Sequence, residues 1–310
     1  MMLIIAILPV VVTMGFGMVA GRRQQFPSQT SSILIQLVMH YALPLSLFGG
    51  ILSLKRLTIL QNGVVATWLA IGMLGGLGLL LLEQRLTRQP LTAATLRALS
   101  VASPSIPFMG TSVLLIVFGK VSVLLVALGG LYMNLIQVPV SVLLLTLAGG
   151  TVSSQRWRAG WAKLVTASRQ PVVWAPILAF ILNLAGLRLP TPWLASFSEL
   201  GQAAGGVALF ALGMMLAAQK WHLTGAVMHN VVAKNLGLPL LIWGGMVLFK
   251  TPLLAQQLVV LTMAIPTAAI PTMLAVQNHV PATEYVATQL CSTLLAPVTM
   301  ALMIWGLQIH

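Results

Sequence analysis

Apolar residues fill this chain in long stretches, and polar residues gather mainly between them. A helix needs about 20 mostly apolar residues to cross the hydrocarbon core of a bilayer. The connections between the stretches are short, so we expect no separate water-exposed domain. The pattern predicts ten membrane helices, at residues 2–20, 30–53, 59–82, 93–118, 121–148, 171–187, 197–218, 228–249, 254–276 and 284–306.

The composition is that of a protein embedded in lipid. Hydrophobic residues make up 58% of the 310 residues, and charged residues make up only 6%. A water-soluble domain has roughly 25% charged residues, because its surface must face water. We therefore expect an all-α polytopic membrane protein.

The chain is strongly basic, with 16 Lys and Arg residues, 3 Asp and Glu residues and a formal net charge of +13. No basic run exceeds two residues and no basic helix face is visible, so nucleic-acid binding is not indicated. Cytoplasmic loops of membrane proteins are enriched in Lys and Arg. The loops after helices one, three, five and seven hold nine basic residues, and the opposite loops hold five. We predict that the first set is cytoplasmic and that both termini lie outside a plasma (bacterial inner) membrane.

The two halves of the chain resemble each other at an offset of about 160 residues. The paired prolines of the fourth helix correspond to those of the ninth, and residues 138–141 correspond to 296–299. Five helices per half is an odd number, so the second half must run in the opposite membrane orientation. Such inverted repeats are typical of secondary transporters. We predict one repeat at 1–150, a cytoplasmic connecting loop at 151–170 and an inverted repeat at 171–310.

Paired prolines interrupt two predicted helices. Pro104 and Pro107 lie in the fourth helix, and Pro266 and Pro271 lie in the ninth. Proline lacks an N–H group and clashes with the carbonyl one turn back, so two nearby prolines are expected to unwind the segment. The freed backbone groups cannot face lipid. We predict that the two breaks cross and form a site where half-helix N-termini face a carboxylate, the alternative being two tolerated kinks.

Further polar residues lie at membrane depth. His40 and Tyr41 are in the second helix, and Asn134 and Gln137 are in the fifth. These side chains either contribute to the site or only hold neighbouring helices together. Lys234, in the eighth helix, either extends its amine to the membrane surface or supplies positive charge near an anion. The candidate substrate-binding residues are Ser103, Pro104, Ser105, Ile106, Pro107, Pro266, Thr267, Ala268, Pro271, His40, Tyr41, Asn134 and Gln137.

No catalytic or metal-binding pattern accompanies these residues. The acids Glu83, Glu199 and Glu284 fall near helix ends, and the single cysteine, Cys291, lies in an apolar segment. The histidines do not have the spacing of metal ligands. We expect no enzyme, no metal and no cofactor, and we expect Na+ or H+ as the possible coupling ion.

Several motifs occur in order along nearly the whole chain: GRR at 21–23, YALP at 41–44, LF at 47–48, SP at 103–104 with Gly110, PVVWAP at 171–176 and GVALF at 206–210. Together with the ten predicted helices, they make the chain similar to the auxin efflux carrier family. This family includes bacterial members described as malonate or malate permeases.

The resemblance implies a fold of two inverted five-helix repeats. Helices 1, 2, 6 and 7 would form a scaffold that dimerises, and helices 3–5 and 8–10 would form a mobile transport domain centred on the crossover of helices 4 and 9. Transport would resemble an elevator, in which this domain slides against the scaffold. Plant relatives have an asparagine near the proline of helix 4, where this chain has Ser103 and Ser105. That departure weighs against an auxin-like substrate.

The leading hypothesis is a secondary carrier of a small organic anion, such as malonate, malate or a similar carboxylate, working as a homodimer in the bilayer. The alternatives are a transporter-like receptor that binds a solute without flux, a carrier for a non-carboxylate solute, and a channel. The lack of a sizeable cytoplasmic domain disfavours the receptor. The inverted repeat with broken helices disfavours the channel.

Overall fold

In the computed structural model of the chain, the described residues are 2–27, 29–148, 169, 171–187, 189–217 and 223–309. Within these ranges the chain is helical, and its only strand-like pairing is one isolated bridge. The predicted connecting loop, 151–170, lies outside the described residues except for Arg169.

The helices of the first half are α1 (Met2–Arg22), α2 (Thr30–Leu37), α3 (Leu43–Ser53), α4 (Arg56–Gln61), α5 (Gly63–Ala70), α6 (Gly76–Leu86), α7 (Leu91–Ala102), α8 (Thr111–Phe118), α9 (Ser122–Tyr132) and α10 (Val138–Ala148). Those of the second half are α12 (Pro171–Leu184), α13 (Thr191–Ala217), α14 (Gly225–Val232), α15 (Leu238–Leu248), α16 (Leu253–Met263), α17 (Ile270–Gln277) and α18 (Thr283–Gly306). The short turns are π-helical at η1 (Val38–Ala42), η2 (Ile71–Gly75), η3 (Ile106–Gly110), η5 (Met133–Gln137) and η6 (Ala233–Gly237), and 3-10 at η4 (Gly119–Val121).

Three of the π turns have a local cause in the sequence. Pro44, Pro139 and Pro239 each lie two residues after the end of a π turn. The proline ring crowds the carbonyl four residues earlier, and that carbonyl falls inside the π turn. Widening the helix there accommodates the ring, so the helix continues through the proline.

Several helical segments suit a membrane by length and composition. The shorter apolar helices are Leu91–Ala102, Val173–Leu184 and Leu253–Met263. Five longer segments of the described chain could each cross a bilayer: Thr30–Ser53, Gly63–Leu86, Thr111–Leu145, Gly225–Leu248 and Thr283–Gly306. The chain is thus a multi-pass α-helical membrane protein, while the count of ten helices and the inverted repeat stay predictions.

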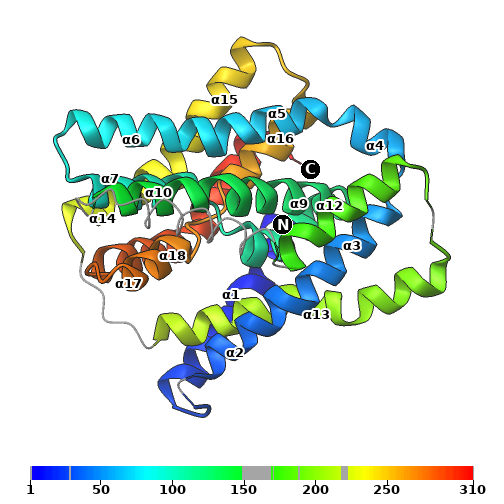
Figure 1. Cartoon of the computed structure of the whole chain (residues 1–310), viewed down its shortest axis with the longest axis horizontal. Coiled ribbons are helices and arrows are strands. Elements are labelled where there is room, and N and C mark those ends of the chain that lie inside the picture. The colour runs from blue at the N-terminus through cyan, green and yellow to red at the C-terminus, as the bar shows by residue number, and fades with distance from the viewer. Residues whose placement is uncertain are drawn as a thin grey trace.

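The helices pack in two groups (Figure 1). In the first, α13 packs along α1, α2 and α3, and α12 packs on α3. We call these five helices the α13 bundle. In the second, α6, α10, α17 and α18 pack on α7, while α14 and α16 pack on α18, α15 packs on α16 and α5 packs on α16. We call this group the α7 bundle. Between the two, α8 contacts α1 and α13, and α9 contacts α3 and α12.

Glycines bring α1 and α13 into close contact. A Cβ atom added at Gly17 would lie 2.1 Å from the carbonyl oxygen of Phe210, and one added at Gly213 would lie 2.1 Å from that of Met14. No other residue fits at such distances, so the two backbones touch along this seam.

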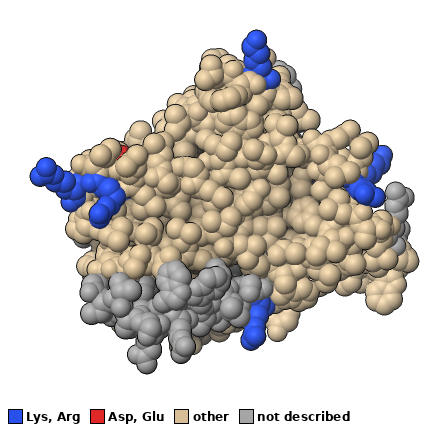
Figure 2. All heavy atoms as spheres, turned by 45° about the horizontal axis from the view of Figure 1, so that its top comes forward, with Lys and Arg blue, Asp and Glu red and all other residues tan. Residues whose placement is uncertain are grey.

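The outer surface is mainly apolar. Leu248, Phe249 and Trp305 are each more than 70% exposed. Figure 2 shows basic side chains projecting at the edges of one face, whose centre carries none. This distribution suits a surface surrounded by lipid, with charges kept near the water on either side.

Candidate functional site

The first helix break follows α7. Its last residue is Ala102, and Ser103 is extended, with φ −106° and ψ 100°. Pro104 cannot donate a backbone hydrogen bond, so the α-helical ladder stops here. The helix resumes as the π turn η3, where the Gly110 N–H donates to the Ser105 carbonyl over 3.0 Å.

The second break follows α16. This helix ends at Met263, and α17 begins at Ile270, with Pro271 as its second residue. Residues 264–269 between them are non-helical and buried, and Pro266 lies in their middle. Both breaks predicted from the paired prolines are therefore present in the chain.

The two breaks satisfy each other's backbone groups. The Ser105 N–H donates to the Pro266 carbonyl over 2.7 Å, and the Ala268 N–H donates to the Ser103 carbonyl over 2.9 Å. Pro104 and Thr267 face each other between these bonds as an isolated antiparallel bridge. Backbone that leaves a helix inside a membrane needs such partners, because lipid supplies none. Residues more than 160 positions apart in the sequence thus form one short strand pair.

Gln137 supports the first break. Its amide nitrogen donates to the carbonyls of Met73, over 2.7 Å, and Ala102, over 3.1 Å. Its amide oxygen accepts from the Ser103 hydroxyl over 2.8 Å. Ala102 is the last residue of α7, so Gln137 binds one of the carbonyls that a helix end leaves unpaired.

Asn235 and Ser292 support the second break in a comparable way. The Thr267 N–H donates to the Ser292 hydroxyl over 3.1 Å, and that hydroxyl donates to the Asn235 side-chain oxygen over 2.6 Å. The Asn235 nitrogen donates back to the Ser292 carbonyl over 2.9 Å. Neither Asn235 nor Ser292 was among the residues predicted for the site. A polar side chain inside an apolar helix was the available signal for both.

The Thr267 hydroxyl is buried and has no hydrogen-bond partner among the described residues. Most buried hydroxyls have at least one partner, so an exception at a break in the backbone requires an explanation. A hydroxyl both donates and accepts, and a small polar ligand or a water molecule would satisfy it.

Lys234 is buried completely, so the interpretation that its amine reaches the membrane surface is wrong. The amine donates to the Met263 carbonyl over 3.0 Å, at the C-terminal end of α16. A helix C-terminus is the negative end of its dipole and attracts a cation. Among the described residues no carboxylate pairs with Lys234.

The other predicted site residues lie in different surroundings. Ile106, Ala268 and Pro271 are buried beside the breaks, and the backbone of Pro107 is part of η3. The Asn134 amide donates to the Gly130 carbonyl of its own helix over 2.8 Å. His40 is exposed and bonds the Gln36 carbonyl over 3.0 Å, and Tyr41 is 61% exposed. The structure thus brings Gln137 to the breaks and leaves His40 and Tyr41 at the surface.

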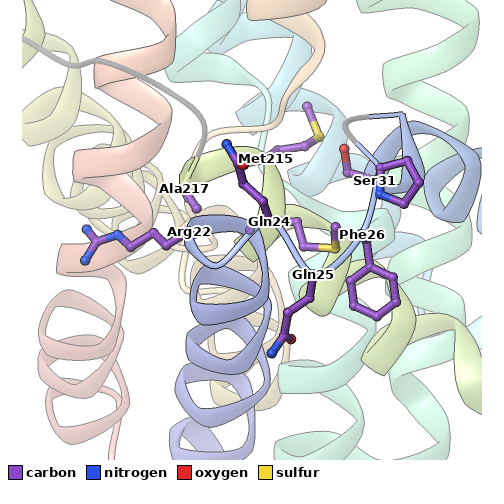
Figure 3. A pocket seen from close by; sticks show the side chains of 10 residues that line it. Arg22, Gln24, Gln25, Phe26, Ser31, Met215 and Ala217 are labelled. Atoms are coloured by element: carbon purple, nitrogen blue, oxygen red, sulfur yellow. The ribbon is translucent and has the colours of Figure 1, made fainter.

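A hollow of about 1000 Å³ lies elsewhere, where α1 ends beside the C-terminal end of α13. In Figure 3, Arg22 points away from the other labelled side chains, which include Gln25 and Phe26. None of the predicted site residues lines this hollow. Its chemistry is therefore separate from that of the breaks.

Broken helices inside a multi-pass bundle are typical of membrane transport proteins. Residues 2–304 match the family model described as "Membrane transport protein", and the chain belongs to this family, the auxin efflux carrier family. It is 32% identical over 244 residues to the "Uncharacterized transporter YfdV" of Escherichia coli strain K12, E. coli O157:H7 and Shigella flexneri. The match covers 76% of this chain and 75% of each relative. The chain is thus a membrane transporter and not an enzyme.

Proposed function

We propose that the chain is a secondary carrier of a small organic anion, such as malonate, malate or a similar carboxylate. The observation that carries this proposal is the pair of helix breaks joined by backbone hydrogen bonds inside the bundle. The Thr267 hydroxyl, which has no partner in the described part of the chain, supplies a polar contact there. Lys234 places a buried amine beside the second break, with no carboxylate partner among the described residues, and its protonated form would favour an anion as the cargo.

The proposed mechanism is elevator-like alternating access. Its support is the division of the helices into the α13 bundle and the α7 bundle. The glycine seam between α1 and α13 favours the α13 bundle as the fixed part, because closely packed backbones resist rearrangement. The α7 bundle, with both breaks, would move. We further propose that α1, α2, α3, α12 and α13 form the interface of a homodimer.

Energy coupling depends on the direction of transport. An inside-negative potential opposes anion uptake by about 2.3 kcal/mol per charge for each 100 mV. Accumulation of a dianion against its electrochemical gradient therefore requires a coupling ion, and we propose Na+ or H+. Export of the same dianion needs no such ion.

The test is uptake of labelled malonate and malate into proteoliposomes, with Na+ and H+ gradients imposed one at a time. Ser105→Leu and Pro266→Ala should each lower saturable uptake by at least about tenfold, the equivalent of 1.4 kcal/mol. The first puts a bulky side chain beside the bond between the breaks, and the second restores an N–H group. Pro297→Ala, which changes a proline inside α18, is the matched control. Unchanged uptake in both break variants would refute this site.

A further inference from the structure

A second hollow, of about 590 Å³, lies on the side of the α13 bundle that faces the α7 bundle, where α3 and α13 face α8 and α9. We call it the inter-bundle hollow. Hydroxyl side chains from both walls line it, and so does Lys120, in the turn between α8 and α9. The hydroxyl residues are Ser46, Ser53, Thr111 and Ser112.

A neighbouring hollow of about 660 Å³ is lined by Lys55 and Arg56 and by the connection between α12 and α13. We call it the side hollow. Ser53 and Leu194 line both hollows, so the two adjoin. Each of the two volumes lies within the range of small-molecule sites in proteins, about 300–1,000 Å³.

The charges around the adjoining hollows have one sign. Lys55, Arg56 and Lys120 are exposed, and none of them forms an ion pair with another described residue. None of the three acids of the chain lines either hollow. A hollow with charges of one sign concentrates ions of the opposite sign.

Glycines of α13 shape the floor of the inter-bundle hollow. An added Cβ at Gly205 would lie 2.4 Å from the Ser112 hydroxyl, and one at Gly201 would lie 2.9 Å from the Ser46 backbone. Gly205 therefore lets α13 lie close to α8 on the opposite wall, and Gly201 lets it lie close to α3 on the same wall. An added Cβ at Gly206 would meet nothing within 4 Å. The missing side chain at this position leaves the hollow open.

We propose that the adjoining hollows are a binding site for small carboxylate ions, with Lys120 as the cation of the inter-bundle hollow and Lys55 and Arg56 as those of the side hollow. The site is distinct from the paired breaks, since none of Ser103, Pro266 and Thr267 lines it. Thr111 and Ser112 begin α8, one π turn after the first break, so the site leads toward it. The proposal rests on the carrier function only in its choice of carboxylate as the ligand.

The test measures charge-selective labelling of a cysteine in the hollow. The parent is a Cys291→Ala, Ser53→Cys chain in proteoliposomes, treated with an anionic sulfonate or a cationic ammonium methanethiosulfonate. We expect Lys120→Gln to lower the anionic-to-cationic rate ratio roughly tenfold. Lys250→Gln, which removes a cation that lines neither hollow, should leave the ratio unchanged. Malonate should slow labelling of the parent and lose this effect in the Lys120→Gln chain.

Gly206→Leu adds a steric test, because its side chain would fill the inter-bundle hollow. We expect it to slow labelling by both reagents, while Gly244→Leu, at an equally open glycine outside the hollow, should not. Ser112→Cys serves as a second reporter. An unchanged rate ratio in Lys120→Gln, no protection by malonate, or no labelling at either cysteine would each overturn the site.

The outcomes separate this site from the carrier function. If malonate slowed cysteine labelling but no carboxylate were taken up, the binding site would be supported and the proposed transport refuted. Saturable carboxylate uptake would support the carrier function. If the labelling rate ratio were then unchanged in the Lys120→Gln chain, the binding site in the hollows would be refuted.

Discussion

At the scale of single residues, two threonines share an uncommon state. The hydroxyls of Thr267 and Thr288 are both buried without a hydrogen-bond partner among the described residues. Leaving such a group unpaired costs roughly 1–3 kcal/mol, and valine has the same shape without the polar atom. Thr267→Val and Thr288→Val should therefore each keep or raise the thermal unfolding temperature in detergent.

Substrate affinity should separate the two variants. Thr267 lies in the paired breaks, whereas Thr288 lies in α18. We expect Thr267→Val to raise the KM for carboxylate uptake by roughly tenfold, the loss of about 1.4 kcal/mol. Thr288→Val should leave KM unchanged. Equal KM values in the two variants would exclude the Thr267 hydroxyl as a substrate contact.

The sequence predicted the location of some site residues well and that of others poorly. The prolines located both breaks, because a missing N–H acts locally in any helix. Gln137 was chosen for its polarity, but its partners Met73 and Ala102 depend on tertiary packing. His40 was placed at the site from its depth along the helix. Depth does not determine which face of an apolar helix is buried, and His40 is exposed.

At the scale of elements, an ion pair joins three helices of the α7 bundle. The Arg97 guanidinium donates to both Glu284 carboxylate oxygens, over 2.7 and 2.9 Å. The Asn230 amide donates to one of these oxygens over 3.3 Å. The contacts connect α7, α14 and α18 at one end of the bundle. A two-bonded, half-buried pair of this kind is stronger than a typical surface ion pair.

A double-mutant cycle tests whether the pair stabilises the bundle. Arg97→Gln and Glu284→Gln should each lower the free energy of unfolding in mild detergent. The double variant should lose less than the sum, with a coupling energy of about 1–3 kcal/mol. The more exposed pair of Glu83 and His229, 3.1 Å apart, is the control and should couple by less than about 1 kcal/mol. Equal coupling in both cycles would contradict a special role for Arg97 and Glu284.

The apolar pattern predicted where helices lie better than it predicted the hydrogen bonding inside them. The predicted helix at 121–148 corresponds to α9, η5 and α10, which begin at Ser122 and end at Ala148. Its π turn was not predicted, because the pattern was read for apolar length and not for local hydrogen bonding. Prolines inside apolar helices were the available signal, as Pro139 illustrates.

At the scale of the whole molecule, the charge distribution predicts orientation. The loop with Arg85 and Arg88 is expected in the cytoplasm, and the loop with Lys55 and Arg56 outside. In a Cys291→Ala background, Lys55→Cys should react with an impermeant maleimide added to intact cells. Arg85→Cys should react only after permeabilisation. The reverse pattern would invert the orientation, and labelling of both from one side would contradict a membrane-crossing helix at 59–82.

The π turns also affect how the sequences of related chains should be aligned. A helix advances by about 100° per residue, so the extra residue in a π turn rotates everything after it by that angle. Met73, Gln137, Lys234 and Asn235 all lie in such turns. A relative lacking one of these bulges would show a single-residue gap within the helix itself. Comparisons should therefore place gaps at 71–75, 133–137 and 233–237 as readily as in loops, or the buried polar positions will be matched to the wrong residues.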